Sequence, residues 1–490
     1  MKLVADEQHQ VAIVGTGFGG IAVAVRLLQS GIQDFVMLER AADIGGVWRD
    51  NDYPGAAVDV QSQLYSFSFA PSAEWRHVFA KQPEIHTYLR QVVDDFALGD
   101  HIQFNVDVEK VRWDGSEGCW QLRTTRGECT ARHVVIATGV LADPLIPALT
   151  GLETYEGVTF HSAQWNHDFD FKGKRVAVIG TGASAVQFVP ELQRSVAKLT
   201  VFQRTPAWVL PRHDHEISEA TRRLLRAAPG LMRLKRLKIY LQREGAVLGF
   251  RHPKLMHSVE RRARRHLASQ VSDPELRAKL TPEYRIGCKR ILISNDYLRS
   301  LDQANVEVVT EVVSEITHRG VADGSGVERE FDAIIFGTGF RTAQLPLTDC
   351  VIGTAGQSMS AVWAGDPAAY LGSAVAGFPN AYLVHGPNIG LGHTSVIHMF
   401  ESQAKYIADA IGHVVSGGLV AVEPSAEAQA QFVGEVRKMS KTTVWTTGGC
   451  TSWYLTQSGA NSSLWPGTTL NFRKRTRQFD AAAHVATAPE

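Results

Sequence analysis

Two glycine-rich turns are the residues whose types and spacing most directly predict chemistry. The first, Gly15-x-Gly17-x-x-Gly20 in "QVAIVGTGFGG", follows an apolar run and opens a helical pattern. Such glycines let backbone N–H groups approach a pyrophosphate at a helix N-terminus. The next apolar run, "DFVMLER", ends in Glu39, at an offset of 24 from Gly15. A carboxylate there accepts hydrogen bonds from both ribose hydroxyls, which predicts a cofactor with a free 2′-hydroxyl, such as FAD or NAD.

The second turn is followed by a base at the offset where the first is followed by an acid. "KRVAVIGTGASA" repeats the glycine pattern, and the same offset of 24 from Gly180 leads to Arg204. A guanidinium forms charge-assisted bonds with a 2′-phosphate, so we expect NADPH here and FAD at the first turn. A solvated arginine at the end of a strand is the alternative for Arg204. The NADP-binding residues expected from this unit are Gly180, Thr181, Gly182, Ser184, Ala185, Arg204 and Thr205.

The elements that must position these turns predict an α/β protein with two dinucleotide-binding, Rossmann-like domains. Two β-branched runs that close on Thr-Gly, 133–139 and 331–340, are expected to return to the first sheet. The FAD domain is then discontinuous, with the NADPH domain inserted into it. The expected ranges are 1–155 for the first part of the FAD domain, 156–330 for the NADPH domain, and 331–490 for the second part of the FAD domain and a C-terminal substrate-pocket region.

Residues 212–285 form a helical and strongly cationic stretch inside the expected NADPH domain. A membrane-surface or nucleic-acid role is one interpretation of this stretch. A solvated helical subdomain is the interpretation that we favour from the sequence. Over the whole chain, 50 Lys and Arg balance 50 Asp and Glu, so no global field favours nucleic acid.

The chain offers little sign of export, membrane insertion or metal binding. It has no apolar leader and no run of 18 uninterrupted apolar residues, so we expect a cytoplasmic protein without an integral membrane segment. Its five cysteines are scattered and never spaced as C-x-x-C, which argues against a disulfide framework, a zinc site or a dithiol redox centre. The sequence predicts no oligomeric state.

FAD and NADPH on one chain imply hydride transfer from nicotinamide to flavin. A disulfide acceptor would need a cysteine pair, and a metal acceptor would need clustered Cys or His; the sequence shows neither pattern. By elimination, the electrons are expected to reach dioxygen or a diffusible small molecule.

Two fingerprints resemble those of the class B flavin monooxygenases, and most of all the type I Baeyer–Villiger monooxygenases, which convert ketones into esters or lactones. "GGVWRDNDYPGAAVD" fills every fixed position of the family pattern G-G-x-W-x4-[FYW]-P-G-x3-D. "YEGVTFHSAQWN" keeps Gly157, His161 and Trp165 of the pattern F-x-G-x-x-x-H-x-x-x-W-[PD], but has Tyr155 and Asn166 at its ends. Related N- and S-oxidising enzymes usually have Tyr or Phe where this chain has Trp165, so that residue favours the Baeyer–Villiger branch.

The resemblance implies an NADPH- and O2-dependent insertion of oxygen next to a ketone carbonyl, by way of a flavin C4a-peroxide. It maps the active-site arginine onto Arg290, where the cation stabilises the peroxyanion and the tetrahedral oxyanion, and its carboxylate partner onto Asp59. Lys289 is implied as a second ligand of the 2′-phosphate. Along the flavin it places Val47, Trp48 and Tyr65, and near the adenine Val108.

Three points stay open at this stage. An N- or S-oxidising flavin monooxygenase is the nearest alternative activity, and a nucleotide-binding sensor without turnover is a more distant one. The tryptophans of the C-terminal region, Trp445, Trp453 and Trp465, are expected either to line a ketone pocket or to pack in the core. The motif with His161 and Trp165 is expected to be a joint between the two nucleotide-binding domains rather than a catalytic group.

Overall fold

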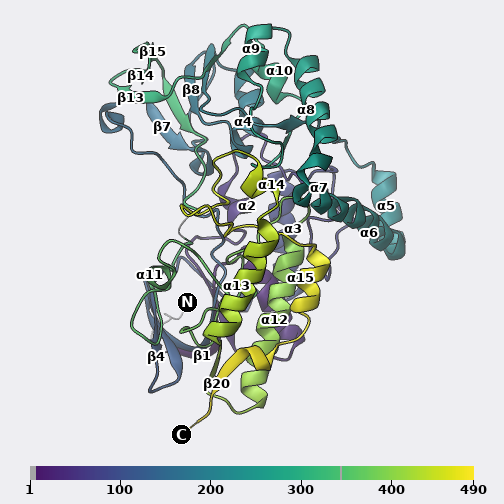
Figure 1. Cartoon of the computed structure of the whole chain (residues 1–490), viewed down its shortest axis with the longest axis vertical. Coiled ribbons are helices and arrows are strands. Elements are labelled where there is room, and N and C mark those ends of the chain that lie inside the picture. Colours follow the sequence, from purple (N-terminus) through teal and green to yellow (C-terminus); the bar gives the residue numbers. More distant parts are fainter. Residues whose placement is uncertain (1–6, 343–344, 490) are drawn as a thin grey trace.

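The computed structural model of the chain describes residues 7–342 and 345–489. Two α/β units lie one above the other along the long axis of the molecule, and a group of helices projects at one side of it (Figure 1). The first strand and the C-terminal helices α12, α13 and α15 belong to the same unit, although most of the chain separates them. This unit is therefore built from both ends of the sequence.

The first sheet has the strand order β17-β4-β5-β6-β1-β2-β3, and β18 pairs with β6. β1 lies between the parallel strands β2 and β6, and its last four residues, Val11 to Val14, are buried because helices and loops cover both faces. The strands are β1 (Glu7–Val14), β2 (Phe35–Glu39), β3 (Ile102–Phe104), β4 (Val108–Asp114), β5 (Cys119–Thr124), β6 (Gly127–Ile136), β17 (Val351–Ile352) and β18 (Ala381–Leu383).

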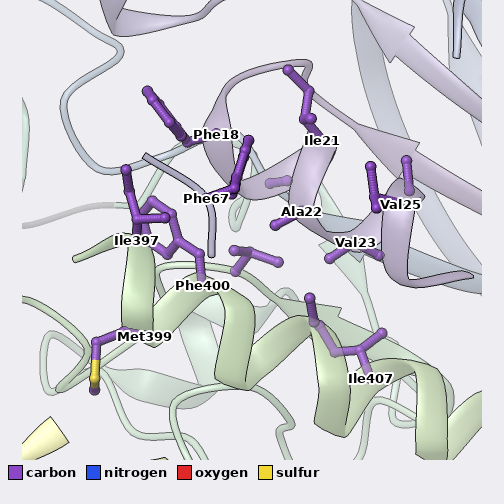
Figure 2. Packing of buried hydrophobic residues seen from close by; sticks show 14 of the residues in the cluster. Phe18, Ile21, Ala22, Val23, Val25, Phe67, Ile397, Met399, Phe400 and Ile407 are labelled. Carbon is purple, nitrogen blue, oxygen red and sulfur yellow. The ribbon is translucent and has the colours of Figure 1, made fainter. Parts of the chain in front are cut away.

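Helix α1 (Phe18–Gln29) connects β1 to β2 and packs against α12 (Ile397–Ser416). Figure 2 shows the contact: Ile21 and Val25 of α1 and Ile407 of α12 belong to one buried cluster. α12 has a wide apolar face and α1 is almost wholly buried, so this contact closes the core between the two ends of the chain. The other helices of the unit are α2 (Val47–Asp50), α3 (Gln82–Asp95), α11 (Met359–Trp363), α13 (Ala426–Ser440), α14 (Val444–Thr447) and α15 (Thr469–Arg475). β19 (Ala421–Pro424), just before α13, pairs antiparallel with β20 (His484–Thr487), which follows α15.

The second sheet is parallel throughout, in the order β12-β9-β8-β16-β7. Its strands are β7 (Val158–His161), β8 (Arg175–Ile179), β9 (Lys198–Phe202), β12 (Val306–Val309) and β16 (Ala333–Phe336), and its helices are α4 (Ala183–Gln193) and α10 (Tyr297–Leu301). Two small sheets accompany it: β10 (Val209–Leu210) with β11 (Leu292–Ile293), and β13 (Val313–Thr317) with β14 (Gly320–Asp323) and β15 (Glu328–Glu330).

One strand assignment from the sequence is wrong. Residues 133–139 return to the first sheet as β6, but the run 331–340 supplies β16, which pairs with β8 and β7 in the second sheet. Each nucleotide unit has its own strand that ends in Thr-Gly beside its glycine turn. A Cβ on Gly15 would lie 2.7 Å from the Ala137 carbonyl oxygen, and one on Gly180 would lie 2.3 Å from the Gly337 carbonyl oxygen. The second sheet therefore extends past residue 330, the boundary expected from the sequence.

The stretch 212–285 is helical, as expected. It forms α5 (Glu219–Ala227), α6 (Pro229–Gly245), α7 (Val247–Arg251), α8 (His257–Gln270) and α9 (Pro274–Lys279). The Ser218 hydroxyl accepts a hydrogen bond from the Thr221 backbone N–H and begins α5, and Asp273 caps α9 in the same way. None of the helices in the described part of the chain combines the length and apolarity needed to cross a bilayer.

The expectation that the cysteines form no disulfide is also wrong. Cys288 and Cys450 are bonded across a sequence separation of 162 residues. Spacing rules detect cysteines that are close in sequence, whereas this pair is brought together by the fold. The bond ties the segment just before Arg290 to the C-terminal region, and a backbone hydrogen bond from Arg285 to Gly448 runs alongside it.

The tight packing of the first turn makes a direct prediction about stability. A Cβ on Gly20 would lie 2.0 Å from the Gly15 carbonyl oxygen, whereas one on Gly434, an exposed residue in α13, would meet nothing within 4 Å. Gly20→Ala should lower the free energy of unfolding by about 3 kcal/mol through overpacking. Gly434→Ala should raise it by roughly 0.5–1 kcal/mol, because alanine has the better helix propensity. Thermal and urea unfolding would measure both, and equal stability of the two variants would contradict the packing argument.

Candidate active site at the joint of the two units

An ion pair between Arg290 and Asp59 lies at the centre of the candidate site. Nε of Arg290 donates to Oδ2 of Asp59 at 2.9 Å, and Nη2 donates to both carboxylate oxygens at 2.7 Å. The two residues are 231 positions apart, so the fold brings together a fingerprint of the first unit and a segment inside the second. A bidentate pair of this kind fixes the plane of the guanidinium as well as its position.

The third bond of Arg290 reaches the second half of the first unit. Nη1 donates to the Leu391 carbonyl oxygen at 2.9 Å, within "GPNIGLGHTS". A guanidinium has five N–H groups, and the four hydrogen bonds to Asp59 and Leu391 leave at least one of them free to face a ligand. The side chains of Arg290 and Asp59 remain about one third exposed, at 33% and 29%. The pair is therefore held by the chain and still accessible.

The electrostatics keep both members of the pair charged. The negative charge of Asp59 is the largest influence on Arg290 and raises its pKa above the already high usual value. Burial opposes ionisation of Asp59, but the charge of Arg290 and the hydrogen bonds from it outweigh burial and lower the pKa of the carboxyl. At neutral pH the site thus presents a permanent cation with a fixed counter-ion.

The first glycine turn fits a bound pyrophosphate. A Cβ on Gly17 would have its nearest neighbour, the Gly46 Cα, only at 3.9 Å, so this glycine faces open space between two stretches of backbone. Gly46 in turn faces Gly17, and the Gly45 N–H donates to the Thr16 carbonyl oxygen at 3.1 Å. The first two glycines of "GGVW" therefore form the opposite wall of the turn, and glycine on both sides leaves a narrow channel lined by backbone.

Glu39 lies at the end of β2, beside this turn, as the sequence predicts. Its carboxylate accepts hydrogen bonds from the Thr16 hydroxyl at 2.6 Å and the Thr16 N–H at 3.1 Å. It also pairs with Arg49 at 2.8 Å, a contact that the sequence does not indicate. A buried carboxylate at this position is anchored by the turn itself, so its distance from the turn is fixed.

The aromatic residues expected beside the flavin form a connected group. Val47 and Trp48 begin α2, directly after the glycine pair. The Trp48 indole N–H donates to the Tyr65 hydroxyl at 3.0 Å, and the two rings meet edge to face. Burial raises the pKa of Tyr65 to about 12, so its hydroxyl stays protonated. Val108 lies apart from this group, at the start of β4, where it is buried in an apolar cluster with residues of β1 and β2.

The central part of the fingerprint, Tyr53 to Ala57, contacts helix α4 of the second unit. The Tyr53 hydroxyl donates to Oε1 of Gln187 at 3.0 Å, and Nε2 of Gln187 donates to the Ala57 carbonyl oxygen at 2.7 Å. Gly55 has φ +82°, and a Cβ there would lie 2.6 Å from the Gln187 carbonyl oxygen. Only glycine allows this close approach, so the fingerprint is also an interface between the two units.

The second turn has the same geometry as the first. Gly182 has open space around it, with the nearest atom 4.0 Å away, whereas Ala185 at the third position is fully buried against the sheet. The Thr181 hydroxyl donates to the Thr205 carbonyl oxygen at 3.1 Å and so ties the turn to the end of β9. Ser184 lies in the first turn of α4 and is partly exposed.

Two cations lie together beyond this turn. Arg204 is exposed, directly after β9, and Lys289 is close enough for their charges to repel. Burial and then the charge of Arg204 lower the pKa of Lys289, whose ammonium lies 5.3 Å from the centre of the Tyr284 ring. In the part of the chain that the structure describes, no ion pair joins either residue to an acid. A pair of unneutralised cations suits a doubly charged phosphate.

The motif "YEGVTFHSAQWN" packs at the junction of the units. The Trp165 ring lies 6.4 Å from that of Tyr53 in the fingerprint and 5.2 Å from that of Phe188 in α4. His161 is fully buried, and its Nδ1 accepts a hydrogen bond from the Ala163 N–H at 3.1 Å. Burial lowers the pKa of His161, so the ring is neutral.

Gly157 and Tyr155 have a joint role at the start of this motif. A Cβ on Gly157 would lie 2.3 Å from the Tyr155 hydroxyl, which donates to the Phe331 carbonyl oxygen at 2.8 Å. The glycine thus leaves room for the tyrosine ring to fold back over the chain. A phenylalanine in place of Tyr155, as in the family pattern, would lack the hydroxyl that donates to Phe331.

The C-terminal tryptophans divide between the two expected roles. Trp445 and Trp465 are core residues, 1% and 0% exposed. Trp453 is 48% exposed and lines a cleft together with residues of "HGPNIG", His385 to Gly390. Only Trp453 therefore remains available to a ligand. The lining of the cleft is Val140, Thr342, Leu345, Pro367, His385, Gly386, Pro387, Gly390, Trp453, Ser462 and Ser463.

Some residues around the ion pair had no signal in the sequence. Arg243 of α6 donates to the Asp59 carbonyl oxygen at 3.3 Å and to Oε1 of Gln61 at 2.8 Å. Tyr454 is 3% exposed and interacts electrostatically with Arg290. Arg243 is one of many cations in the helical stretch, and no spacing marks it. Among the described residues no group of three His, Cys, Asp or Glu side chains is placed to hold a metal ion.

Comparisons with known proteins agree with this geometry. Residues 8–363 match the model of the flavin-binding monooxygenase-like family. The chain is 49% identical to a Baeyer–Villiger monooxygenase of Streptomyces coelicolor over 99% of its own length and 93% of the relative's. It is 48% identical to another Baeyer–Villiger monooxygenase, from Pseudomonas aeruginosa, with the same two coverages.

Solved structures give the same result for the fold. A closed crystal structure of cyclohexanone monooxygenase superposes with a TM-score of 0.87 at 28% identity, covering 99% of this chain and 100% of the other. An oxidised steroid monooxygenase bound to NADP superposes with a TM-score of 0.85, also at 28% identity and with the same coverages. With its two nucleotide-binding units, its complete fingerprint and relatives of nearly equal length, the chain belongs to the flavin-binding monooxygenase family and, within it, to the Baeyer–Villiger monooxygenases.

Proposed function

We propose that this protein inserts one oxygen atom next to the carbonyl of a small-molecule ketone, using FAD, NADPH and O2, and releases an ester or a lactone. The bidentate ion pair between Arg290 and Asp59 is the observation that carries the proposal. The names of the structural relatives, cyclohexanone monooxygenase and steroid monooxygenase, support a ketone as the substrate. The cytoplasm, where NADPH is regenerated, is the proposed compartment.

FAD would be held by the first turn and the fingerprint that faces it. Gly15, Gly17 and Gly20 would bind the pyrophosphate at the start of α1, and Glu39 would bind the ribose. Val47, Trp48 and Tyr65 would lie along the ring system. Val108, which is enclosed in the core, would contribute to the wall of the adenine site rather than to a polar contact.

NADPH would be held by the second turn, with Arg204, Thr205 and Lys289 at the 2′-phosphate. Two adjacent cations without an acidic partner are unfavourable unless a ligand supplies the anion, which is the physical support for this assignment. When it is bound and reduced, the flavin supplies the electrons that activate dioxygen.

Arg290 would stabilise the negatively charged oxygen atoms that form during the reaction. Because Asp59 keeps the guanidinium oriented and the pKa of Arg290 is raised, the cation persists throughout turnover. Its free N–H would bind the negatively charged oxygen that attacks the carbonyl and then the oxyanion that forms from the ketone. Neither residue needs to transfer a proton.

Oxidation of nitrogen or sulfur is the less supported alternative. In those reactions the substrate is the nucleophile and a neutral oxygen donor suffices, so a fixed cation is unnecessary. The oriented pair of Arg290 and Asp59 therefore favours the nucleophilic reaction at a carbonyl. A sensor without turnover is disfavoured by family membership and predicts no oxygen uptake.

The first prediction of this proposal concerns Arg290. Arg290→Ala should lower the rate of ester or lactone formation at least about 100-fold, the usual cost of removing a donor to a developing oxyanion. Flavin reduction by NADPH should stay within a few-fold of the wild-type rate, measured by stopped-flow absorbance. Arg285→Ala is the matched control, because this arginine of the same segment is exposed and its side chain forms a hydrogen bond with the exposed His257. Full product formation by Arg290→Ala would refute the role.

The second prediction concerns the choice of nicotinamide cofactor. Arg204→Ala should raise the Kd for NADPH about 10- to 100-fold, as expected for the loss of charge-assisted bonds worth about 1.5–3 kcal/mol. The Kd for NADH, which has no 2′-phosphate, should change little. Arg194→Ala, an exposed arginine at the other end of α4, serves as the control. Equal losses for both cofactors would contradict the assignment.

The third prediction concerns the motif at the junction. We propose that His161 and Trp165 anchor the connector while the units shift between flavin reduction and oxygenation. His161→Ala should lower the ratio of product formed to NADPH consumed, while both cofactors remain bound. His252→Ala, an exposed histidine at the end of α7, should leave the ratio unchanged. A wild-type ratio in His161→Ala would show that the anchor is dispensable.

A further inference from the structure

We propose that the outer face of helices α5, α6 and α7 and of the turn Pro253–Met256 that follows them docks on an anionic lipid bilayer. This surface, called the leucine face below, is made of seven leucines that are 41% to 61% exposed. They supply seven of the seventeen exposed large apolar residues in the described chain, within a stretch of 32 residues. The three helices project from the side of the molecule in Figure 1. The leucine face consists of Leu224, Leu231, Leu234, Leu237, Leu241, Leu248 and Leu255.

Helix α6 shows that the exposure follows a pattern. At 100° per residue, Leu231, Leu234, Leu237 and Leu241 fall within an arc of about 120°. The opposite side carries Met232 and Ile239, which are buried against the rest of the protein. α6 is therefore apolar on two sides, and only one of them has a partner within the chain.

The inner side of α6 is fixed to the candidate site. Arg236 donates to the Gln63 carbonyl oxygen at 2.7 Å and to the Ser66 hydroxyl at 2.9 Å. Arg243 contacts the Asp59 backbone. These bonds set the rotation of the helix about its axis, so the leucines are held outward by structure and cannot turn inward.

Cations border the leucine face. On α6, Arg233 lies about 40° outside one edge of the leucine arc and Lys238 lies inside it, about 20° from the other edge. Arg251 and Lys254 follow near Leu248 and Leu255. All four side chains are exposed, and none forms an ion pair with an acid in the described structure. From residue 219 to residue 256 the chain has ten Arg and Lys against two Glu, a net charge of +8. The acids do not offset the four bordering cations, because Glu219 pairs with arginines of α5 and Glu244 is buried.

The combination of leucines and unpaired cations indicates which kind of partner binds the leucine face. A second copy of the chain would bring the unpaired cations of two leucine faces together across a two-fold axis, which is repulsive. A nucleic acid would use the cations but leave the leucines in water. An anionic bilayer satisfies both, because leucines enter the boundary of the acyl chains while cations bind the phosphate headgroups. A fully solvated helical subdomain would also leave the exposure of these seven leucines unexplained.

The position of the leucine face next to the candidate site indicates how a substrate could enter. This point rests on the function proposed above. The outer side of α6 would lie on the bilayer while its inner side borders Asp59. A ketone that partitions into lipid would then reach the site from the membrane rather than from water. Docking itself does not depend on the reaction and is tested without turnover.

The test is flotation of the flavin-loaded protein with vesicles. Vesicles of phosphatidylcholine alone are compared with vesicles of phosphatidylcholine and phosphatidylglycerol in equal parts. Wild-type protein should partition at least about 10-fold more strongly to the anionic vesicles, and added salt should weaken this binding. Ketone turnover in the absence of vesicles is measured separately, so its failure would count against the proposed function and not against docking.

Two variants separate the contributions, and a third controls for surface changes. Combining Leu234→Ser, Leu237→Ser and Leu241→Ser should lower vesicle binding at least about 10-fold, as should Arg233→Glu combined with Lys238→Glu. The control combines Leu470→Ser with Lys474→Glu, an exposed leucine and lysine one helical turn apart on α15, and should bind like wild type.

Several results would overturn the proposal. They are absence of vesicle binding by wild type, equal binding to neutral and anionic vesicles, or full binding by the leucine variant. Binding of duplex DNA that only the charge variant loses, without vesicle binding, would assign the face to nucleic acid. A dimer in sedimentation velocity that the leucine variant abolishes, again without vesicle binding, would assign it to a second copy.

Discussion

The ion pair between Arg290 and Asp59 constrains the rest of this structure. A guanidinium in a partly buried site needs a counter-charge, and here the charge comes from the other nucleotide-binding unit. Because the pair is bidentate and a third bond reaches Leu391, one side chain joins the first part of the first unit, the second unit and the returning second part. The orientation of the cation is therefore linked to the relative placement of these three segments, which the Cys288–Cys450 bond and the contacts of Gln187 also hold together.

The fingerprint at residues 45–59 is restricted in composition because its residues contact both units. Its glycine pair lines the first turn, its tryptophan contacts Tyr65, its tyrosine and Gly55 contact Gln187 of α4, and its last residue holds Arg290. The fixed positions thus meet partners in both units. A fifteen-residue stretch can be so restricted in composition because it forms the wall of one site and the contact surface to the other.

Local pattern explains which features were predictable from the sequence. The two turns, Glu39, Arg204 and the helical stretch follow from residue spacing, whereas the roles of Asp59 and Arg290 follow from the family resemblance. The strand 331–340 was assigned to the wrong sheet because both units end a strand in Thr-Gly, and only pairing distinguishes them. The bond between Cys288 and Cys450 and the contact of Arg243 join residues distant in sequence, for which no local pattern exists.

The two cationic sites differ in how the chain treats their charge. Arg290 receives a carboxylate from the protein, and its pKa is raised; Lys289, which lies next to Arg204, receives none, and its pKa is lowered by burial and by that neighbour. The first arrangement is complete without a ligand and keeps its cation at any pH at which Asp59 stays ionised. The second lacks an acidic partner in the described structure, so a bound anion and the protonation of Lys289 would favour each other. One chain thus holds a cation that keeps its charge beside one whose charge an anionic ligand would stabilise, as the proposed cofactor site requires.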